Sequence, residues 1–322
     1  MKKLLTTLLA CTLLLSGCGN GETKNDNAYK IGVLQYLTHD ALDAALKGFK
    51  DGMNELGYVE GENVVYDVQN PQADQSALAQ IAQTLVNNEP DMILAIATPA
   101  AQQLQGETKE IPIIGTAITD YEETKLVNTN NNPGANITGT SDGCPMDVQI
   151  DLMLKLDPSI KNVGILYTSS EENSVIQARQ AEAELTKRGL NVTVKTVSGK
   201  NEINDTMEAF GTKIDALYIP TDNNIASAMA SVDTVAKQNG ILTIVGESNM
   251  VKNGGAASVG VDYYKLGKQT AVMADKILKG QAKVEETPIE TLSDLDIYVN
   301  SNTLKELNIS VPSDMAAIDM AE

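Results

Sequence analysis

The sequence KIGVL at residues 30–34 decides the fold, because a similar stretch, NVGIL, returns at residues 162–166. Each stretch is followed by a polar turn and a segment of helical character. These segments end in Leu-Gly-Tyr at residues 56–58 and in Arg-Gly-Leu at residues 188–190. The two beginnings and the two endings are both separated by 132 residues. The repeat predicts that the chain contains the same strand-helix unit twice.

Further apolar stretches continue this alternation in both halves of the chain. They are short and continuous, which is typical of parallel strands that are covered by helices on both faces. They lie at residues 63–68, 91–96 and 111–115 in the first half, and at residues 191–197, 215–219 and 241–246 in the second. The sequence therefore predicts parallel sheets in both halves.

The segments between these strands have the spacing of amphipathic helices. Leu42, Leu46, Phe49, Met53 and Leu56 recur at steps of three or four residues, so they form one buried helix face. Together with the strands, this spacing predicts an α/β fold of two doubly wound parallel-sheet lobes joined by a hinge.

The N-terminal segment predicts where the protein operates. Lys2 and Lys3 precede an apolar run that is too short to span a membrane, and the run ends in Leu-Ser-Gly-Cys at residues 15–18. This ending resembles the bacterial lipobox, so we expect a signal peptide over residues 1–17 and lipidation of Cys18. An ordinary cleaved signal is the alternative. Residues 18–28 are polar and predict a lipid-anchored flexible tether. The protein would then be extracytoplasmic and anchored to the bacterial cell membrane.

The composition excludes several classes of function. The chain has 24 Lys and Arg against 43 Asp and Glu, and its net charge is −19. Such a chain repels phosphate backbones, so we expect no nucleic-acid partner. With no Trp and only two Phe, the chain offers few aromatic platforms for a sugar.

Catalytic and metal-binding residue types are scarce as well. His39 is the only histidine, which argues against a transition-metal site and against Ser-His-Asp or Cys-His catalysis. Cys144 has no partner once Cys11 leaves with the signal peptide and Cys18 is lipidated. There is also no Gly-rich phosphate loop and no Gly-x-Ser-x-Gly motif. We therefore expect no enzyme activity, no metal and no cofactor.

The ends of the predicted strands supply the candidate ligand-binding residues, because ligands of doubly wound sheets bind at the carboxyl ends of the strands. Hydroxyls and carboxylates dominate there, and basic side chains are missing. The candidates are Gln35, Leu37, Thr98, Thr119, Asp120, Ser141, Asp142, Ser170, Glu171, Thr221, Asp222, Asn223 and Glu247.

Two interpretations of these residues remain open. Each Ser, Thr or Asp could simply cap a helix. As a set, they suit a small zwitterion whose ammonium pairs with a carboxylate and whose carboxylate accepts hydrogen bonds from hydroxyls and helix N-termini. Asp120 and Asp222 are the leading ammonium partners, and Thr98, Ser141 and Thr221 are the leading carboxylate contacts.

Several stretches resemble the substrate-binding lipoproteins of ABC transporters, of the tryptophan/tyrosine type. They are IGVLQ (31–35), AIATPAA (95–101), TAITD (116–120), NITGTSD (136–142), PTDN (220–223) and VDYYKLG (261–267). The last stretch adds Asp262 to the candidate ligand-binding residues. Where this family often has proline after the Thr-Asp pair, the chain has Tyr121.

The resemblance implies a periplasmic-binding fold of type I with three crossings between the lobes. Lobe 1 would comprise residues 29–141 and about 262–290, and lobe 2 residues 142–261 and about 291–322. The implied ligands are aromatic or other hydrophobic amino acids, which the protein would deliver as a monomer to an ABC permease and its ATPase. A ligand sensor of the same fold that docks on a receptor, and a sugar- or nucleoside-binding relative, are the alternatives.

Overall fold

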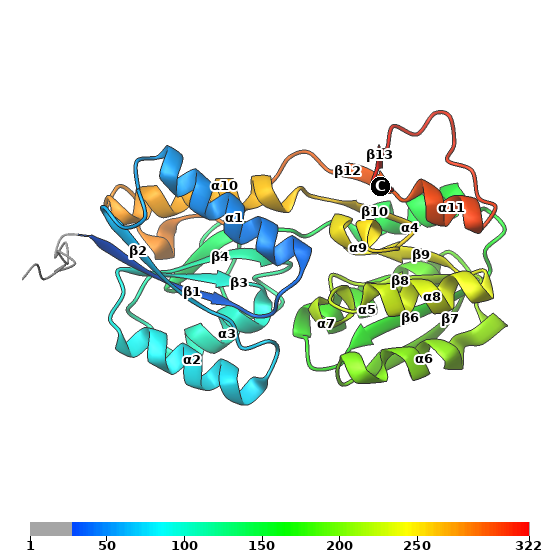
Figure 1. The fold of residues 1–322 in the computed structure, drawn as a ribbon, viewed down its shortest axis with the longest axis horizontal. Coiled ribbons are helices and arrows are strands. Elements are labelled where there is room, and N and C mark those ends of the chain that lie inside the picture. The colour runs from blue at the N-terminus through cyan, green and yellow to red at the C-terminus, as the bar shows by residue number, and fades with distance from the viewer. Residues whose placement is uncertain (1–27, 322) are drawn as a thin grey trace, which may run out of the picture.

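The computed structural model describes residues 28–321, which form two lobes side by side (Figure 1). The predicted signal peptide, Cys18 and nearly all of the predicted tether lie outside these described residues. Within residues 28–321, no helix is both long enough and apolar enough to cross a membrane.

Lobe 1 is the half of the molecule built on a six-stranded sheet with the order β11-β5-β4-β3-β1-β2. The strands that pair in this sheet are parallel. The strands are β1 (Tyr29–Gln35), β2 (Val64–Gln69), β3 (Met92–Ile96), β4 (Ile113–Ile118), β5 (Ile137–Ser141) and β11 (Glu290–Thr291). The apolar stretches of the first half are therefore strands, as predicted.

Lobe 2 is the half built on a seven-stranded sheet with the order β13-β12-β10-β9-β8-β6-β7. Its strands are β6 (Asn162–Thr168), β7 (Asn191–Val197), β8 (Ala216–Ile219), β9 (Leu242–Val245), β10 (Ala257–Gly260), β12 (Asp296–Val299) and β13 (Ile318–Asp319). The prediction of a parallel sheet holds except at β12, which is antiparallel to β10, and at β13, which runs parallel to β12. The chain leaves β10 for lobe 1 and returns from β11 of lobe 1 to the end of the sheet at which β10 stopped, so β12 runs in the opposite direction to β10.

Helices cover both faces of both sheets (Figure 1). In lobe 1, α1 and α10 lie on one face and α2 and α3 on the other; in lobe 2, α4 and α5 lie opposite α6 and α8. The helices are α1 (Asp40–Glu55), α2 (Gln75–Asn87), α3 (Thr98–Glu107), α4 (Met146–Leu156), α5 (Glu172–Lys187), α6 (Ile203–Phe210), α7 (Asn223–Ala226), α8 (Met229–Asn239), α9 (Ser248–Lys252), α10 (Tyr263–Leu278) and α11 (Ser301–Glu306), with 3-10 turns η1 (Lys200–Glu202), η2 (Gly211–Lys213) and η3 (Val284–Glu286).

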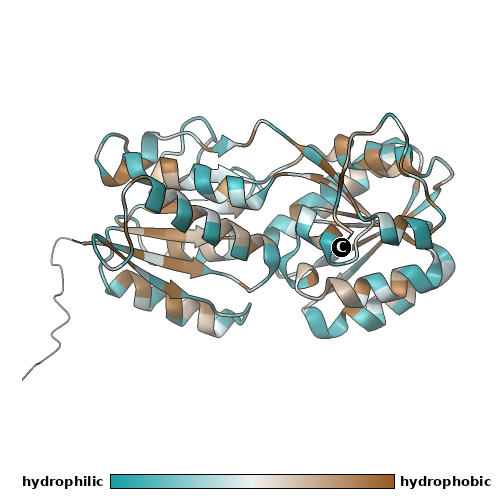
Figure 2. Ribbon diagram, turned by 45° about the horizontal axis from the view of Figure 1, so that its top comes forward, coloured by the Kyte–Doolittle hydropathy of each residue, from teal (hydrophilic) through white to brown (hydrophobic). Residues whose placement is uncertain are grey.

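The hydropathy of the chain follows this layering, with apolar residues on the strands and polar residues on the outward helix faces (Figure 2). In β6, Val163 and Ile165 belong to the core beneath α4 and α5, whereas Leu166 belongs to the core beneath α6 and α8. Burial of both sheet faces explains why these strands are continuous apolar runs in the sequence.

The chain crosses between the lobes three times, after β5, after β10 and after β11. The second crossing leads into α10, which packs backbone to backbone on α1. A Cβ atom at Gly48 would lie 2.0 Å from the carbonyl oxygen of Tyr264, and one at Gly267 would lie 2.0 Å from that of Ala45. This close approach fixes the returning segment to lobe 1.

An irregularity at the end of β4 shapes the edge of lobe 1 that faces lobe 2. The pairing of β4 with β5 shifts register between Gly115 and Ile118, and Ala117 has a positive φ of 55°. Bulges of this kind redirect side chains at the ends of strands. Tyr121 is fully buried beside this bulge, and its hydroxyl donates to the carbonyl of Thr140 at 3.1 Å.

Candidate ligand-binding site

A narrow cavity, with about 10 Å³ of space for water-sized groups, lies where the two lobes meet. Residues from both lobes and from the crossings line it, mostly at the carboxyl ends of strands, where ligands of such sheets bind. The lining residues are His39, Leu42, Ala117, Thr119, Asp142, Asn173, Thr221, Asp222, Asn223, Ala226, Glu247 and Tyr263.

The cavity is acidic. Burial raises the pKa of Asp142, of Asp222 and of Glu247, in the last case to about 8. Among the lining residues, His39 alone carries a basic side chain, and burial lowers its pKa. Desolvated carboxylates without a basic partner favour a cationic group in the cavity.

Three polar atoms of the lining are buried and lack a hydrogen-bond partner: Asp142 Oδ1, Asn173 Oδ1 and His39 Nδ1. The rest of each side chain is held in place. The hydroxyl of Tyr263 donates to Asp142 Oδ2 at 2.6 Å, and Asn173 Nδ2 donates to the carbonyl of Thr221 at 2.7 Å. Because buried polar atoms are normally paired, these three atoms mark where polar groups of a ligand can bind.

The other carboxylates on the lobe 2 side hold the beginnings of helices. Asp222 accepts hydrogen bonds from the backbone N–H of Thr168 at 2.6 Å and of Ile225 at 3.0 Å. Glu247 accepts from the N–H of Asn249 at 2.7 Å. Helix capping therefore explains part of the chemistry at these two residues.

Several of the sequence-predicted site residues meet in this cavity. They are Thr119, Asp142, Thr221, Asp222, Asn223 and Glu247. The structure therefore brings candidate residues from both halves together, and one of them, Asp222, also caps α7.

The other predicted residues lie outside the cavity lining: Gln35, Leu37, Thr98, Asp120, Ser141, Ser170, Glu171 and Asp262. Asp120 accepts from the N–H groups of Glu122 and Glu123 at 3.0 and 2.9 Å, so it caps its own turn. Asp262 likewise caps α10.

Four of these residues have local partners or face solvent. Gln35 Nε2 donates to Asp43 Oδ1 at 2.6 Å, and the Ser141 hydroxyl donates to the carbonyl of Thr119 at 2.8 Å. Ser170 is exposed. Glu171 is fully buried and accepts from Asn223 and Asn224, so it acts one layer behind the cavity.

Sequence reasoning missed six residues of the lining: His39, Leu42, Ala117, Asn173, Ala226 and Tyr263. Of these, His39 could have been found from its position in the sequence, because it immediately precedes the helix that follows β1. The apolar members carry no chemical signature in the sequence, and Asn173 lies within the first turn of α5 and not at a strand end.

Side chains bridge the lobes around the cavity. His39 Nε2 lies 3.1 Å from Asn223 Oδ1, and Asn253 Nδ2 lies 3.4 Å from Asp40 Oδ2. Arg179 also forms an ion pair with Glu123. These contacts join lobe 1 to lobe 2 directly, so the structure is a closed arrangement.

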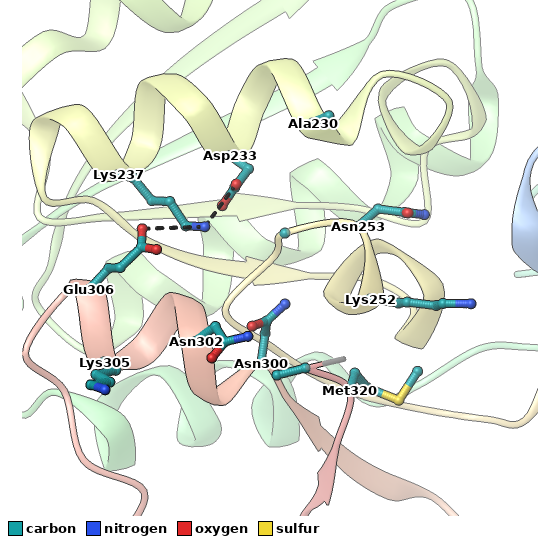
Figure 3. Close-up of a pocket in the computed structure, with 12 residues that line it drawn as sticks. Ala230, Asp233, Lys237, Lys252, Asn253, Asn300, Asn302, Lys305, Glu306 and Met320 are labelled. Carbon is teal, nitrogen blue, oxygen red and sulfur yellow. Dashed lines mark ion pairs between the residues drawn. The ribbon is translucent and has the colours of Figure 1, made fainter.

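A larger hollow, with about 870 Å³ of space for water-sized groups, lies elsewhere on lobe 2 and is lined by α8, α9, α11 and the C-terminal residues (Figure 3). Its Lys237 pairs with Asp233 at 3.0 Å and with Glu306 at 3.4 Å. Because all of its lining belongs to one lobe, closure of the lobes would not enclose a ligand there. The cavity between the lobes is therefore the candidate site.

The chain is similar in sequence and fold to several known proteins. Residues 30–319 match the family described as ABC transporter substrate binding protein. The tyrosine-binding protein of Clostridioides difficile is 37% identical over 321 residues, which cover 96% of this chain and 93% of that protein.

Two solved structures extend the comparison. An ABC domain from Streptococcus pneumoniae in complex with L-Trp is 39% identical and superposes with a TM-score of 0.85, covering 89% of this chain and 96% of that one. A ligand-free, open substrate-binding protein from Clostridium difficile is 38% identical, with a TM-score of 0.69 and coverage of 91% and 99%.

Proposed function

The chain belongs to the ABC transporter substrate binding protein family, and we propose that it captures an aromatic amino acid between its lobes for import. The observation that carries this proposal is the unpartnered, buried Oδ1 of Asp142 in an acidic cavity between the lobes. An α-ammonium supplies the positive charge and the hydrogen-bond donors that this oxygen lacks.

The remaining parts of an amino acid also find suitable surroundings. The hydroxyl of Thr119 and the N-terminus of α1 are donors for the ligand carboxylate, since the first N–H groups of a helix have no partner within it. The Thr221 hydroxyl instead donates to Gln177 Oε1 at 3.3 Å. Leu42, Ala117 and Ala226 form an apolar part of the lining for the ligand side chain.

The relatives support both the ligand class and the closed arrangement. One is named for tyrosine, and another was solved with L-Trp. At almost equal identity, the chain superposes better on the L-Trp complex than on the ligand-free, open structure, with TM-scores of 0.85 and 0.69. We propose that lobe 1, as residues 29–141 and about 262–290, rocks against lobe 2 at the three crossings when ligand enters.

The proposal extends to the setting of the protein. Substrate-binding proteins of ABC importers are extracytoplasmic. Lipidation of Cys18 would anchor the mature chain to the membrane, where as a monomer it would hand its ligand to a permease driven by an ATPase. The protein itself would carry out no chemical reaction.

Calorimetry of the domain from residue 28 onward tests the ligand class. We expect L-Tyr, L-Trp or L-Phe to bind, and sugars and nucleosides not to bind. Asp142→Asn removes the charge facing the ammonium and should weaken binding tens-fold or more, since losing one partner of a buried charged pair costs about 2–5 kcal/mol. Asp120→Asn is the matched control, because Asp120 caps a turn outside the cavity.

The two substitutions separate binding from capping. Asp120→Asn should leave the affinity for the ligand unchanged. It should lower the free energy of unfolding by at most about 2 kcal/mol, the upper end of the cost of losing a helix cap. Equal affinities of Asp142→Asn and wild-type protein would refute the ammonium site. Binding of sugars alone would refute the proposed ligand class.

A further inference from the structure

His39 belongs to a chain of hydrogen bonds that runs from the interior of lobe 2 into the cavity. Glu171 Oε2 accepts from the backbone N–H of Asn223 at 3.1 Å and from Asn223 Nδ2 at 2.5 Å. Because the amide nitrogen of Asn223 is engaged there, its Oδ1 faces the His39 ring, with Nε2 at 3.1 Å. The orientation of the Asn223 side chain is thereby fixed.

This orientation sets the tautomer of His39. An amide oxygen can only accept, so Nε2 must carry the proton and donate it to Asn223 Oδ1. In the neutral ring, Nδ1 is then a hydrogen-bond acceptor. His39 is a lining residue of the cavity, and its Nδ1 is shielded from solvent and has no hydrogen-bond partner, although part of the residue is exposed.

We propose that His39 Nδ1 accepts a hydrogen bond from the bound ligand, and that the same ring joins the lobes through Asn223. The inference rests on the proposed function, because it takes the ligand to be an aromatic amino acid. Two groups of such a ligand could supply the donor: the α-ammonium, or the O–H or N–H of a tyrosine or tryptophan side chain.

The position of His39 makes it a positioning and specificity residue. It precedes α1 in lobe 1, whereas Asn223 is the first residue of α7 in lobe 2. Closure of the lobes therefore supplies the partner that fixes the proton on Nε2 and leaves Nδ1 free to accept. A ligand that donates to Nδ1 favours the closed state by its differential contacts.

The surroundings of the ring predict a pH dependence. The acidic groups around it are Asp40 and Asp43 on its own helix, Asp142, Asp222 and Glu247 in the cavity lining, and Glu171 behind Asn223. Burial outweighs them and lowers the pKa of His39, so the closed state favours the neutral ring. Binding should be complete above the ordinary histidine pKa of about 6.5 and should weaken as the pH falls below it.

Two substitutions separate the nitrogens of the ring. His39→Gln places an amide nitrogen near the position of Nε2 and keeps a donor for Asn223, but it removes the acceptor at Nδ1. His39→Asn places an oxygen near the position of Nδ1 and loses the bridge to Asn223. The affinities of both variants and of wild-type protein for L-Tyr, L-Phe and the deaminated analogue of tyrosine are measured by calorimetry, with thermal melts to verify folding.

We expect the affinity of His39→Gln for L-Tyr to be lower than that of wild type by about ten-fold or more, because a buried hydrogen bond to the ligand is lost. The affinity of this variant should also no longer fall at low pH. If the side-chain hydroxyl is the donor, L-Phe is little affected. If the ammonium is the donor, L-Tyr and L-Phe weaken equally and the deaminated analogue does not. In both cases His39→Asn should keep the ligand preference of wild-type protein.

Wild-type affinity of His39→Gln for every ligand, with an unchanged pH profile, would overturn this inference and leave the proposed function intact. Absence of aromatic amino acid binding by the wild-type protein would instead overturn the proposed function itself, and the inference with it.

Discussion

On the lobe 2 side of the cleft, Glu171, Asp222 and Glu247 are buried carboxylates whose oxygens accept hydrogen bonds from helix N-termini. In lobe 1, three alanines have positive φ: Ala73 with 61°, Ala97 with 81° and Ala117 with 55°. The two lobes repeat one strand-helix plan, yet fully buried, hydrogen-bonded carboxylates distinguish the lobe 2 side, and alanines with positive φ distinguish lobe 1. A shared topology thus places both sides at the strand ends without determining their chemistry.

The difference also separates two ways of fixing a binding surface. Buried carboxylates are costly unless nearby donors satisfy them, so the lobe 2 side depends on a complete set of hydrogen bonds. A non-glycine residue with positive φ costs of order 1–3 kcal/mol, which the surrounding packing must offset. Substitutions on the two sides should therefore change stability in opposite directions.

The largest effect is expected at Glu171. Its carboxylate accepts from the backbone N–H and the side-chain amide of both Asn223 and Asn224. Glu171→Ala leaves these donors without a partner, and each unsatisfied buried group costs about 1–3 kcal/mol, so we expect a loss of about 3 kcal/mol or more in urea unfolding.

The neighbouring residue provides the control for that experiment. Glu172 is exposed and contacts Gln102 of lobe 1. Glu172→Ala should change the free energy of unfolding by no more than about 0.5 kcal/mol. Equal stabilities of the two variants would show that the buried hydrogen bonds do not organise the lobe 2 side.

A pH titration tests the second buried carboxylate. The pKa of Glu247 is raised from 4.5 to about 8, chiefly because burial disfavours the charged form. The folded protein therefore prefers the protonated carboxyl. Stability from this group is complete below about pH 4.5 and is lost as the pH rises through about 8, by up to about 1.4 kcal/mol for each pH unit between.

Glu247→Gln has no proton to lose at this site, and its side-chain oxygen can still accept from Asn249. Denaturation of both proteins between about pH 5 and about pH 8 should therefore show a steeper loss of stability for wild type than for this variant. Glu208→Gln, at an exposed position on α6, should keep the wild-type slope. Parallel slopes for wild type and Glu247→Gln would mean that Glu247 does not titrate in this range.

Much of the fold could be predicted because it depends on local patterns. The repeat around Gly32 and Gly164 and the apolar stretches identify β1, β6 and the strands that follow, since strands buried on both faces must be continuously apolar. The antiparallel β12 was not predicted, because its direction depends on a return from the other lobe and not on its own residues.

The candidate site was less predictable, because its chemistry depends on distant partners. Asp120 and Asp142 look alike in the sequence. The donors of Asp120 are two and three residues away, whereas the hydroxyl that fixes Asp142 belongs to Tyr263, 121 residues further along. Which carboxylate keeps a free oxygen in the cavity therefore depends on α10, which the chain reaches only after its second crossing between the lobes, and not on spacing in the sequence. The unpartnered Nδ1 of His39 similarly depends on Asn223 of the other lobe.

The smallest effect is expected on the lobe 1 side, at Ala97. This residue precedes α3 with φ 81° and ψ 154°, a region that is essentially restricted to glycine. Ala97→Gly removes one buried methyl group but also the backbone strain, so we expect the free energy of unfolding to rise by about 1 kcal/mol. Ala95→Gly is the matched control, since Ala95 is equally buried in β3 but is not among the residues with positive φ. There the loss of the methyl group and the added flexibility of the unfolded chain should lower stability by about 1 kcal/mol.

Urea unfolding of the two variants, whose substitutions are identical and only two residues apart, isolates the backbone contribution. If Ala97→Gly is destabilised as much as Ala95→Gly, the lobe 1 side stores no strain, and the contrast between the two sides of the cleft would rest on the buried carboxylates alone.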